Sequence, residues 1–473
     1  MAYCDKFGKH FSWFGKPILM WFSLKLKKRV LVWVLLFLSI PAFTQKKTLQ
    51  DYIEAGLDNN ITLQNEALNL KEAYYRLEVA KGMFYPSLSF KSDYTYSSGG
   101  RAFTFPIGDL LNPVYSSLNE LTETNNFQDI PNASFNLNAN DFYNHRLSIT
   151  VPLIDKEIFL QKKLQKETIS QQEAEVLVYK RKLVRDIKEA YFNIVKVKNQ
   201  IETLRKADTL LQDNYKITLS KVNNGTALKG DALKIHTQIN NNDAELQKAQ
   251  NDFKNACAYL NFLTNNYLTR SISIDTTNFE IPPKSSLTEN HEILDRPELQ
   301  SLQSQIAQAK YDVKIKKSAF LPTVYTSLDL GYQNSYFKFE PKDRYLQGIV
   351  SLKWDLFTGF RNKNNIRISK INVEELENTL SQTAKQYQLD LENALRDRNS
   401  AEIKMQNSEV NVKDLMEYYR EMKVRYEQGV VLLIELNDAF NQLINEELEL
   451  EQTKTNVLLK QATIEQITAS YQF

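Results

Sequence analysis

The sequence carries one local pattern twice, and each copy joins a helical segment to an extended one through a proline. Residues 81–90 read KGMFYPSLSF and residues 317–326 read KSAFLPTVYT. Before each proline, apolar residues recur at alternating steps of four and three; after it, they alternate with polar residues. Proline lacks the N–H that a helix needs and restricts the residue before it, so each helix is expected to end there. The duplication predicts one supersecondary unit used twice.

Four β-strands are expected, two in each copy. Leu88, Phe90 and Tyr94 share one face of the first strand, and serines and charged residues occupy the other. Segments of about ten residues with one apolar face are typical of outer-membrane barrels. A half-buried sheet in a soluble protein gives the same alternation. The expected strands cover residues 87–97, 143–152, 323–333 and 345–354.

The segment between the first two strands, 97–142, is long and rich in Asn, Ser, Gly and Pro. Its counterpart in the second copy, about 334–344, is far shorter. Outer-membrane barrels combine long outward loops with short inward turns. We therefore expect 97–142 to be a loop outside the cell.

Two very long helices follow the strands, over residues 157–222 and 361–427, and neither range contains a proline. The apolar positions of the first repeat about every 3.5 residues, which predicts coiled-coil packing. At 1.5 Å per residue each helix would be about 100 Å long. Gly225 and Gly429 follow the two helices, and glycine can adopt the left-handed conformation that ends a helix. Helices returning from these turns complete two helical hairpins.

The amino terminus reads as a secretory signal. Basic residues at 25–29 precede an apolar run over 30–40, which is short for a membrane span. Residues 1–44 are therefore expected to be a signal peptide, with cleavage near Thr44–Gln45; the alternative is an amino-terminal membrane anchor. The mature part, 45–473, would hold repeat 1 (about 48–269) and repeat 2 (about 291–470).

Charge and composition exclude several classes of function. The chain has a formal charge of +2, but residues 1–44 carry seven basic and one acidic residue, a net of +6, which leaves about −4 (2 − 6) for the rest. This balance gives no support to nucleic-acid binding. Cys257 is the lone cysteine after the signal, and the four histidines are scattered. No metal site, cofactor or catalytic arrangement is expected.

Four strands cannot close a barrel, and open strand edges are not tolerated in lipid. Two copies would supply eight strands and three copies twelve. Eight strands fill their interior with side chains, whereas twelve can leave a lumen. Because the long helices make sense only if a lumen continues through them, three copies are favoured.

Together these features resemble the outer membrane efflux protein family, the TolC-like channels. The resemblance covers residues 48–470 and rests on the doubled helix–proline–strand passages, the glycine turns, and the junctions at 151–153 and 354–359. It implies an α+β membrane protein, internally duplicated, whose four strands contribute to a trimeric 12-stranded outer-membrane barrel that continues into a periplasmic α-helical coiled-coil barrel. The strand-elbow prolines are Pro86, Pro152 and Pro322.

The resemblance also implies a function, a location and partners. The chain would be a subunit of the trimeric exit duct of a tripartite efflux pump or a type I secretion system. It would lie in the outer membrane of a Gram-negative bacterium, with its helices in the periplasm. A periplasmic adaptor and an inner-membrane pump of RND or ABC type would be its partners, beside membrane lipid. The alternative is a periplasmic coiled-coil scaffold without a channel.

A periplasmic gate is implied near the second glycine. Glu435 and Asp438 match the family's acidic rings, six and nine residues after Gly429. Residues three apart on a helix share a face, so three copies would place six carboxylates around a small aperture. Such a ring favours cations. The simpler interpretation is a solvated helix face near a turn.

A latch for this gate is implied by Tyr426 and Asp231, which match a tyrosine and an acid that the family links in the closed state. The sequence departs from the family at Val431, where a basic residue is common, and at Gly230, where a hydroxyl side chain is common. A direct Tyr426–Asp231 link is the expectation.

The two helical turns, about 222–230 and 426–434, are expected to dock the adaptor. They interrupt the helices at the end opposite the membrane and offer polar side chains and exposed backbone, although ordinary turns have the same composition. The expected docking residues are Asn223, Asn224, Gly225, Thr226, Gln428 and Gly429.

Overall fold

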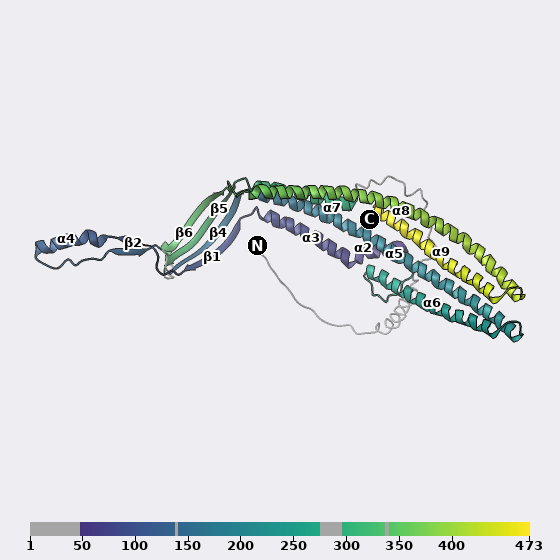
Figure 1. Ribbon diagram of the computed structural model, residues 1–473. Coiled ribbons are helices and arrows are strands. Elements are labelled where there is room, and N and C mark those ends of the chain that lie inside the picture. Colours follow the sequence, from purple (N-terminus) through teal and green to yellow (C-terminus); the bar gives the residue numbers. More distant parts are fainter. Residues whose placement is uncertain (1–47, 138–140, 275–295, 336–339) are drawn as a thin grey trace, which may run out of the picture.

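The computed structural model describes residues 48–137, 141–274, 296–335 and 340–473. The expected signal peptide lies outside the described residues. The molecule is elongated, with a β-sheet between a long helical body on one side and a narrow extension on the other (Figure 1). This shape follows from two helices of 68 and 67 residues that each run without a break.

One antiparallel sheet contains the four main strands in the order β1-β4-β5-β6. Leu88 of β1 lies opposite Ile149 of β4, which lies opposite Leu328 of β5. Among the described residues, β1 and β6 are each paired on one side only, so the sheet has two open edges. The strands are β1 (Ser87–Thr95), β4 (Phe142–Ile154), β5 (Thr323–Ser335) and β6 (Arg344–Lys353).

The two faces of this sheet differ in polarity. One carries a row formed by Phe90, Leu147, Leu330 and Leu346, all exposed in the single chain. On the other face the Ser148 hydroxyl donates to Asp329, and Arg146 lies 3.2 Å from Asp93. An exposed apolar row of this size in an isolated chain marks a surface that something else covers.

The described residues between β1 and β4 contain regular elements that the expectation of a loop at 97–142 did not include, while the placement of this segment outside the cell stays a prediction. The segment contains β2 (Ala102–Phe105), α4 (Ile107–Thr122) and β3 (Ala133–Asn136), and β2 pairs with β3. Asparagine side chains tie α4 to the chain that returns beside it, which composition alone does not show.

The helical body contains seven helices among the described residues. The longest, α5, contacts α2, α3, α6, α7 and α9, and α8 pairs with α9 and α7. No described helix holds an apolar stretch long enough to cross a bilayer. The helices are α2 (Leu49–Asn59), α3 (Ile61–Gly82), α5 (Lys156–Asn223), α6 (Lys229–Leu263), α7 (Pro297–Ser318), α8 (Arg361–Glu427) and α9 (Leu433–Ile467), beside a 3₁₀ turn at Pro341–Asp343.

Two buried clusters stabilise the helical body. Near the middle, Ile187 and Ile194 of α5 pack with Ile53 of α2 and Leu260 of α6. At the end far from the sheet, Leu211 of α5 belongs to a cluster with residues from α6, α8 and α9. The second cluster joins the two helical hairpins of one chain, and so the two glycine turns lie at the same end of the molecule (Figure 1).

Candidate functional site

The two helical turns at the far end have the same backbone structure. Gly225 has φ +74° and Gly429 has φ +77°, values that favour glycine. The N–H of Thr226 donates to the carbonyl of Lys221 at 2.8 Å, and the N–H of Val430 donates to that of Arg425 at 2.9 Å. The N–H of each glycine also donates to the carbonyl three residues earlier. The two bonds together form the Schellman motif that ends a helix.

The acid six residues after each glycine caps the returning helix. The N–H of Leu228 donates to the Asp231 carboxylate at 3.1 Å, and the N–H of Leu432 donates to the Glu435 carboxylate at 2.7 Å. Each acid stands in the first turn, where the helix dipole favours negative charge. The duplicated acid therefore has a structural role in both repeats.

Glu435 and Asp438 are both exposed on α9, and the residue that follows each of them is buried. Leu436 and Ala439 are fully buried, so α9 turns its apolar side into the chain and its acids away from it. The Gln442 amide donates to Asp438 at 2.7 Å. The two expected gate acids thus lie on one exposed face of the returning helix.

Tyr426 pairs with Thr218, and the expected direct link to Asp231 is not made. The hydroxyl groups of Tyr426 and Thr218 share a 2.9 Å hydrogen bond in the buried space between α8 and α5. The Asp231 carboxylate instead accepts from the N–H of Leu228 at the start of α6. Burial raises the pKa of the Tyr426 phenol, the Thr218 bond lowers it in part, and the Asp231 charge raises it further. Tyr426 is therefore neutral at physiological pH.

Other contacts join the two turns across the chain. The Lys221 ammonium lies 5.1 Å from the centre of the Tyr426 ring, a cation–π geometry. Lys423 of α8 lies 3.9 Å from Asp213 of α5. Val431, where the resemblance implies a basic residue, packs against the buried cluster at this end.

Two buried asparagines, which the sequence pattern did not single out, lie in the same region. Asn214 of α5 accepts a hydrogen bond from the Tyr419 hydroxyl at 3.2 Å, but its amide nitrogen has no partner among the described residues. Asn437 of α9 is 3% exposed, and neither of its amide atoms has such a partner. Each buried polar atom left unpaired costs about 1–3 kcal/mol. Polar residues inside an apolar stripe are the signal that could have found them.

All six expected docking residues are exposed at the two turns. Two exposed apolar residues at these turns were not among those expected. Leu228 and Leu432, each three residues after a glycine, are 76% and 72% exposed. Apolar side chains this exposed stand at equivalent positions of both repeats.

The three elbow prolines lie where helices and sheet meet. Pro86 and Pro322 each directly precede a strand, β1 and β5. Pro152 lies in β4 beyond the end of its pairing with β1 and at a register shift against β5. A proline without an N–H is tolerated at such places.

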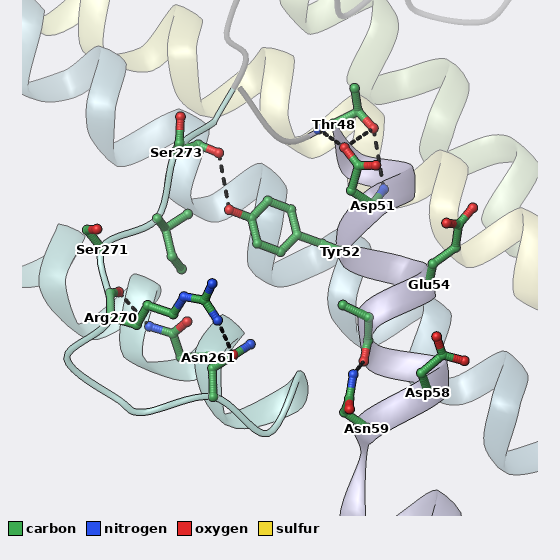
Figure 2. Close-up of a pocket in the computed structure, with 13 residues that line it drawn as sticks. Thr48, Asp51, Tyr52, Glu54, Asp58, Asn59, Asn261, Arg270, Ser271 and Ser273 are labelled. Atoms are coloured by element: carbon green, nitrogen blue, oxygen red, sulfur yellow. Dashed lines mark hydrogen bonds between the residues drawn. The ribbon is translucent and has the colours of Figure 1, made fainter. Parts of the chain in front are cut away.

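A pocket of about 920 Å³ lies between α2 and the segment that follows α6 (Figure 2). Its polar groups serve local structure: the Tyr52 hydroxyl donates to the Ser273 carbonyl at 3.1 Å, and Asp51 accepts from the N–H of Thr48 at 2.7 Å. Arg270 donates to Asn266 at 2.5 Å. These groups do not converge on a common centre, and the pocket provides no candidate site.

Among the residues that the structure describes, no group of three His, Cys, Asp or Glu side chains is placed to hold a metal ion. Burial raises the pKa of the Cys257 thiol to about 11, so the thiol is neutral and unreactive near pH 7.

Comparison with known proteins gives one family and a consistent set of structures. The family model described as outer membrane efflux protein matches residues 52–266 and 290–470. The outer-membrane channel OprN is similar with a TM-score of 0.72 and 14% identity, over 89% of this chain and 90% of that one. VceC of Vibrio cholerae is similar with a TM-score of 0.71 and 15% identity, over 89% of this chain and 95% of that one. CmeC of Campylobacter jejuni is similar with a TM-score of 0.70 and 15% identity, over 89% of this chain and 85% of that one.

At these identities the structural similarities establish a shared fold. No curated protein matches the sequence.

Proposed function

This chain belongs to the outer membrane efflux protein family, and we propose that three copies of it form the exit duct of a tripartite pump. As a member of that family it is a channel subunit of the outer membrane, with its helices in the periplasm, and not an enzyme. Substrates would pass from the pump and its periplasmic adaptor through the lumen to the outside.

The observation that supports the duct best is the open sheet. Four strands leave β1 and β6 unpaired on their outer sides among the described residues, and unpaired edges are not stable in lipid. Pairing β6 of one copy with β1 of the next closes a barrel when three copies supply twelve strands. The apolar row that contains Phe90 and Leu330 would then face lipid, and the polar face with Arg146 and Asp329 would line the lumen.

The test is fractionation and conductance of the mature protein. We expect it in outer membranes as a trimer whose mobility changes on heating, and we expect purified trimers to conduct ions across planar bilayers. A soluble periplasmic monomer or dimer without conductance would instead support the coiled-coil scaffold.

We propose that Glu435 and Asp438 form the acidic gate at the periplasmic end. Both are exposed, and both project from the same face of α9 beside the turn. Three copies around an axis would bring six carboxylates together, and such rings favour cations. Glu435 also caps α9, so replacing it has two effects that must be separated.

The internal duplication supplies the control for this gate. Glu435→Gln keeps an oxygen that can accept from Leu432 but removes the charge, and Asp231→Asn does the same in the first repeat. We expect Glu435→Gln to lower the cation preference of the channel while Asp231→Asn leaves it unchanged. Equal effects of the two variants would contradict a gate at Glu435.

We propose that the two turns dock a periplasmic adaptor, which couples the duct to an inner-membrane pump of RND or ABC type. Leu228 and Leu432 offer exposed apolar contacts, and Asn223, Asn224 and Gln428 offer polar ones beside them. We expect Leu432→Asp to lower adaptor binding and drug resistance while the heat-modifiable trimer persists, and Leu432→Met to retain both. Normal adaptor binding by Leu432→Asp would argue against docking at this turn.

A further inference from the structure

The segment between β1 and β4 extends away from the sheet on the side opposite the helical body (Figure 1). It consists of the β2–β3 ribbon and α4, together with the chain that returns from α4 to β3. We call it the outer rod (residues 101–137). Because β1 is an edge strand of the sheet, the outer rod is attached beside the edge that a second copy would pair with. In the second repeat β5 ends at Ser335 and β6 begins at Arg344, and the described residues between them hold only a short 3₁₀ turn.

Asparagine side chains make the outer rod an ordered structure. Asn112 donates to the carbonyl of Ile130 at 3.1 Å and accepts from its N–H at 2.9 Å. Asn119 makes the same pair of bonds with Phe127, at 2.7 and 3.0 Å. Asn112 and Asn119 are two helical turns apart and therefore lie on one side of α4. That side is fixed against the returning chain.

Close packing at the base of α4 supports this view. The Asn132 side chain accepts from the N–H groups of Gly108 and Asp109 at 2.9 and 3.0 Å and donates to Asp109 at 2.9 Å. A Cβ at Gly108 would lie 2.2 Å from the carbonyl oxygen of Ile130. The sequence thus holds α4 and its returning chain in one arrangement.

A different side of α4 is apolar and only partly covered within one chain, because Ile107, Leu111 and Leu118 are half-buried while Val114 and Leu121 are exposed. Its apolar residues are spaced at steps of four and three, the pattern of a coiled-coil seam. Leu121 is 82% exposed and Val114 51%, and the adjacent Leu110 is 68% exposed. Asp109, Ser116 and Glu120 lie on yet another side, which is polar. The seam residues are Ile107, Leu111, Val114, Leu118 and Leu121.

The β2–β3 ribbon adds a second uncovered apolar surface. Phe103 lies opposite Phe135, and both are exposed, as is Phe105 on the same face. A two-stranded ribbon is marginally stable alone in water. With Gly108 the only buried residue of α4, the outer rod lacks a core of its own and needs a partner.

Charge and position identify that partner. Residues 101–137 contain Asp109, Glu120, Glu123 and Asp129 against one Arg101, so an anionic lipid surface would repel the rod. Rotation about the axis of the trimer brings three identical seams to one end of the duct. Resting on the trimer of the proposed function, we propose that three α4 helices pack through their seams into a three-helix bundle over the outer mouth of the duct.

Cysteine cross-linking in the assembled protein tests this bundle. Cys257→Ala removes the one native thiol of the mature chain; Leu121→Cys then places a thiol in the seam and Ser116→Cys places one on the polar side. Mild oxidation of intact outer membranes with copper phenanthroline joins two thiols in one disulfide. We expect Leu121→Cys to give a covalent dimer, with one of three thiols left free, and at least tenfold more of it than Ser116→Cys.

The heat-modifiable trimer, measured on the same samples, separates the two proposals. Trimers present without preferential cross-linking at Leu121 would overturn the three-helix bundle and leave the duct intact. Absence of trimers would overturn the proposed function itself. A second seam variant, Val114→Cys, guards against a local distortion at Leu121, and it too must cross-link for the bundle to stand.

Discussion

Removing the Tyr426 hydroxyl tests how one chain holds its two helical hairpins together at the periplasmic end. Tyr426→Phe leaves Thr218, which is fully buried, without the 2.9 Å bond that it shares with the phenol. A buried hydroxyl left unpaired costs about 1–3 kcal/mol. Thr218 can turn its hydroxyl toward the carbonyl one helical turn earlier, so the low end of that range applies.

We propose that the Tyr426–Thr218 bond belongs to a closed arrangement of the gate, and a loss of about 1 kcal/mol there corresponds to roughly a fivefold shift toward an open one. We expect Tyr426→Phe to open more often in planar bilayers by about this factor. Thr218→Val removes the other half of the pair with nearly unchanged shape. Since one bond cannot be lost twice, the double variant should resemble each single one, with a coupling of about 1 kcal/mol.

The comparison with Asp231 makes the test decisive. The resemblance to the family implies a link between Tyr426 and Asp231, whereas in the structure Asp231 caps α6. We therefore expect Asp231→Asn and Tyr426→Phe to add independently. Tyr267→Phe, at a tyrosine 88% exposed, controls for loss of a phenol. Additive effects of Tyr426→Phe and Thr218→Val, or strong coupling of Tyr426→Phe to Asp231→Asn, would refute the reasoning.

Three further outcomes follow from the structure. Gly429→Ala places a side chain at φ +77° and should cost about 1–2 kcal/mol, measured as a lower midpoint of thermal unfolding; an unchanged midpoint would contradict the left-handed cap. Burial raises the pKa of the Glu447 carboxyl in the folded protein. The protonated carboxyl therefore contributes stability that is fully present below the unfolded pKa of about 4.3. This contribution is lost as pH rises through the higher pKa of the folded state. Glu447→Gln should flatten this decline in denaturant titrations at pH 4 to 7, and an unaltered slope would speak against it. Cys257, with its thiol pKa raised to about 11, should react with a maleimide only after denaturation; rapid labelling of the native trimer would show that it is accessible.

The sequence by itself determined the fold class, which is confirmed by the family match and the shared fold. The reason is that the residues that end each helix act locally. Pro86 and Pro322 end helices through their own covalent structure, and Gly225 and Gly429 permit the left-handed turns that reverse the chain. Uninterrupted periodicity between these points leaves a long helix as the one regular structure available.

Only the tertiary structure decided which distant side chains meet. Periodicity gives the apolar face of α5, but the partner of Tyr426 depends on how each helix is rotated about its axis, and this brings Thr218 rather than Asp231 to the phenol. Similarly, an asparagine-rich composition fits a loop. In the structure, however, the side chains of Asn112 and Asn119 in α4 donate hydrogen bonds to backbone carbonyls of the chain that returns beside the helix. Such contacts depend on the three-dimensional path of the chain, which the order of residue types along it leaves open.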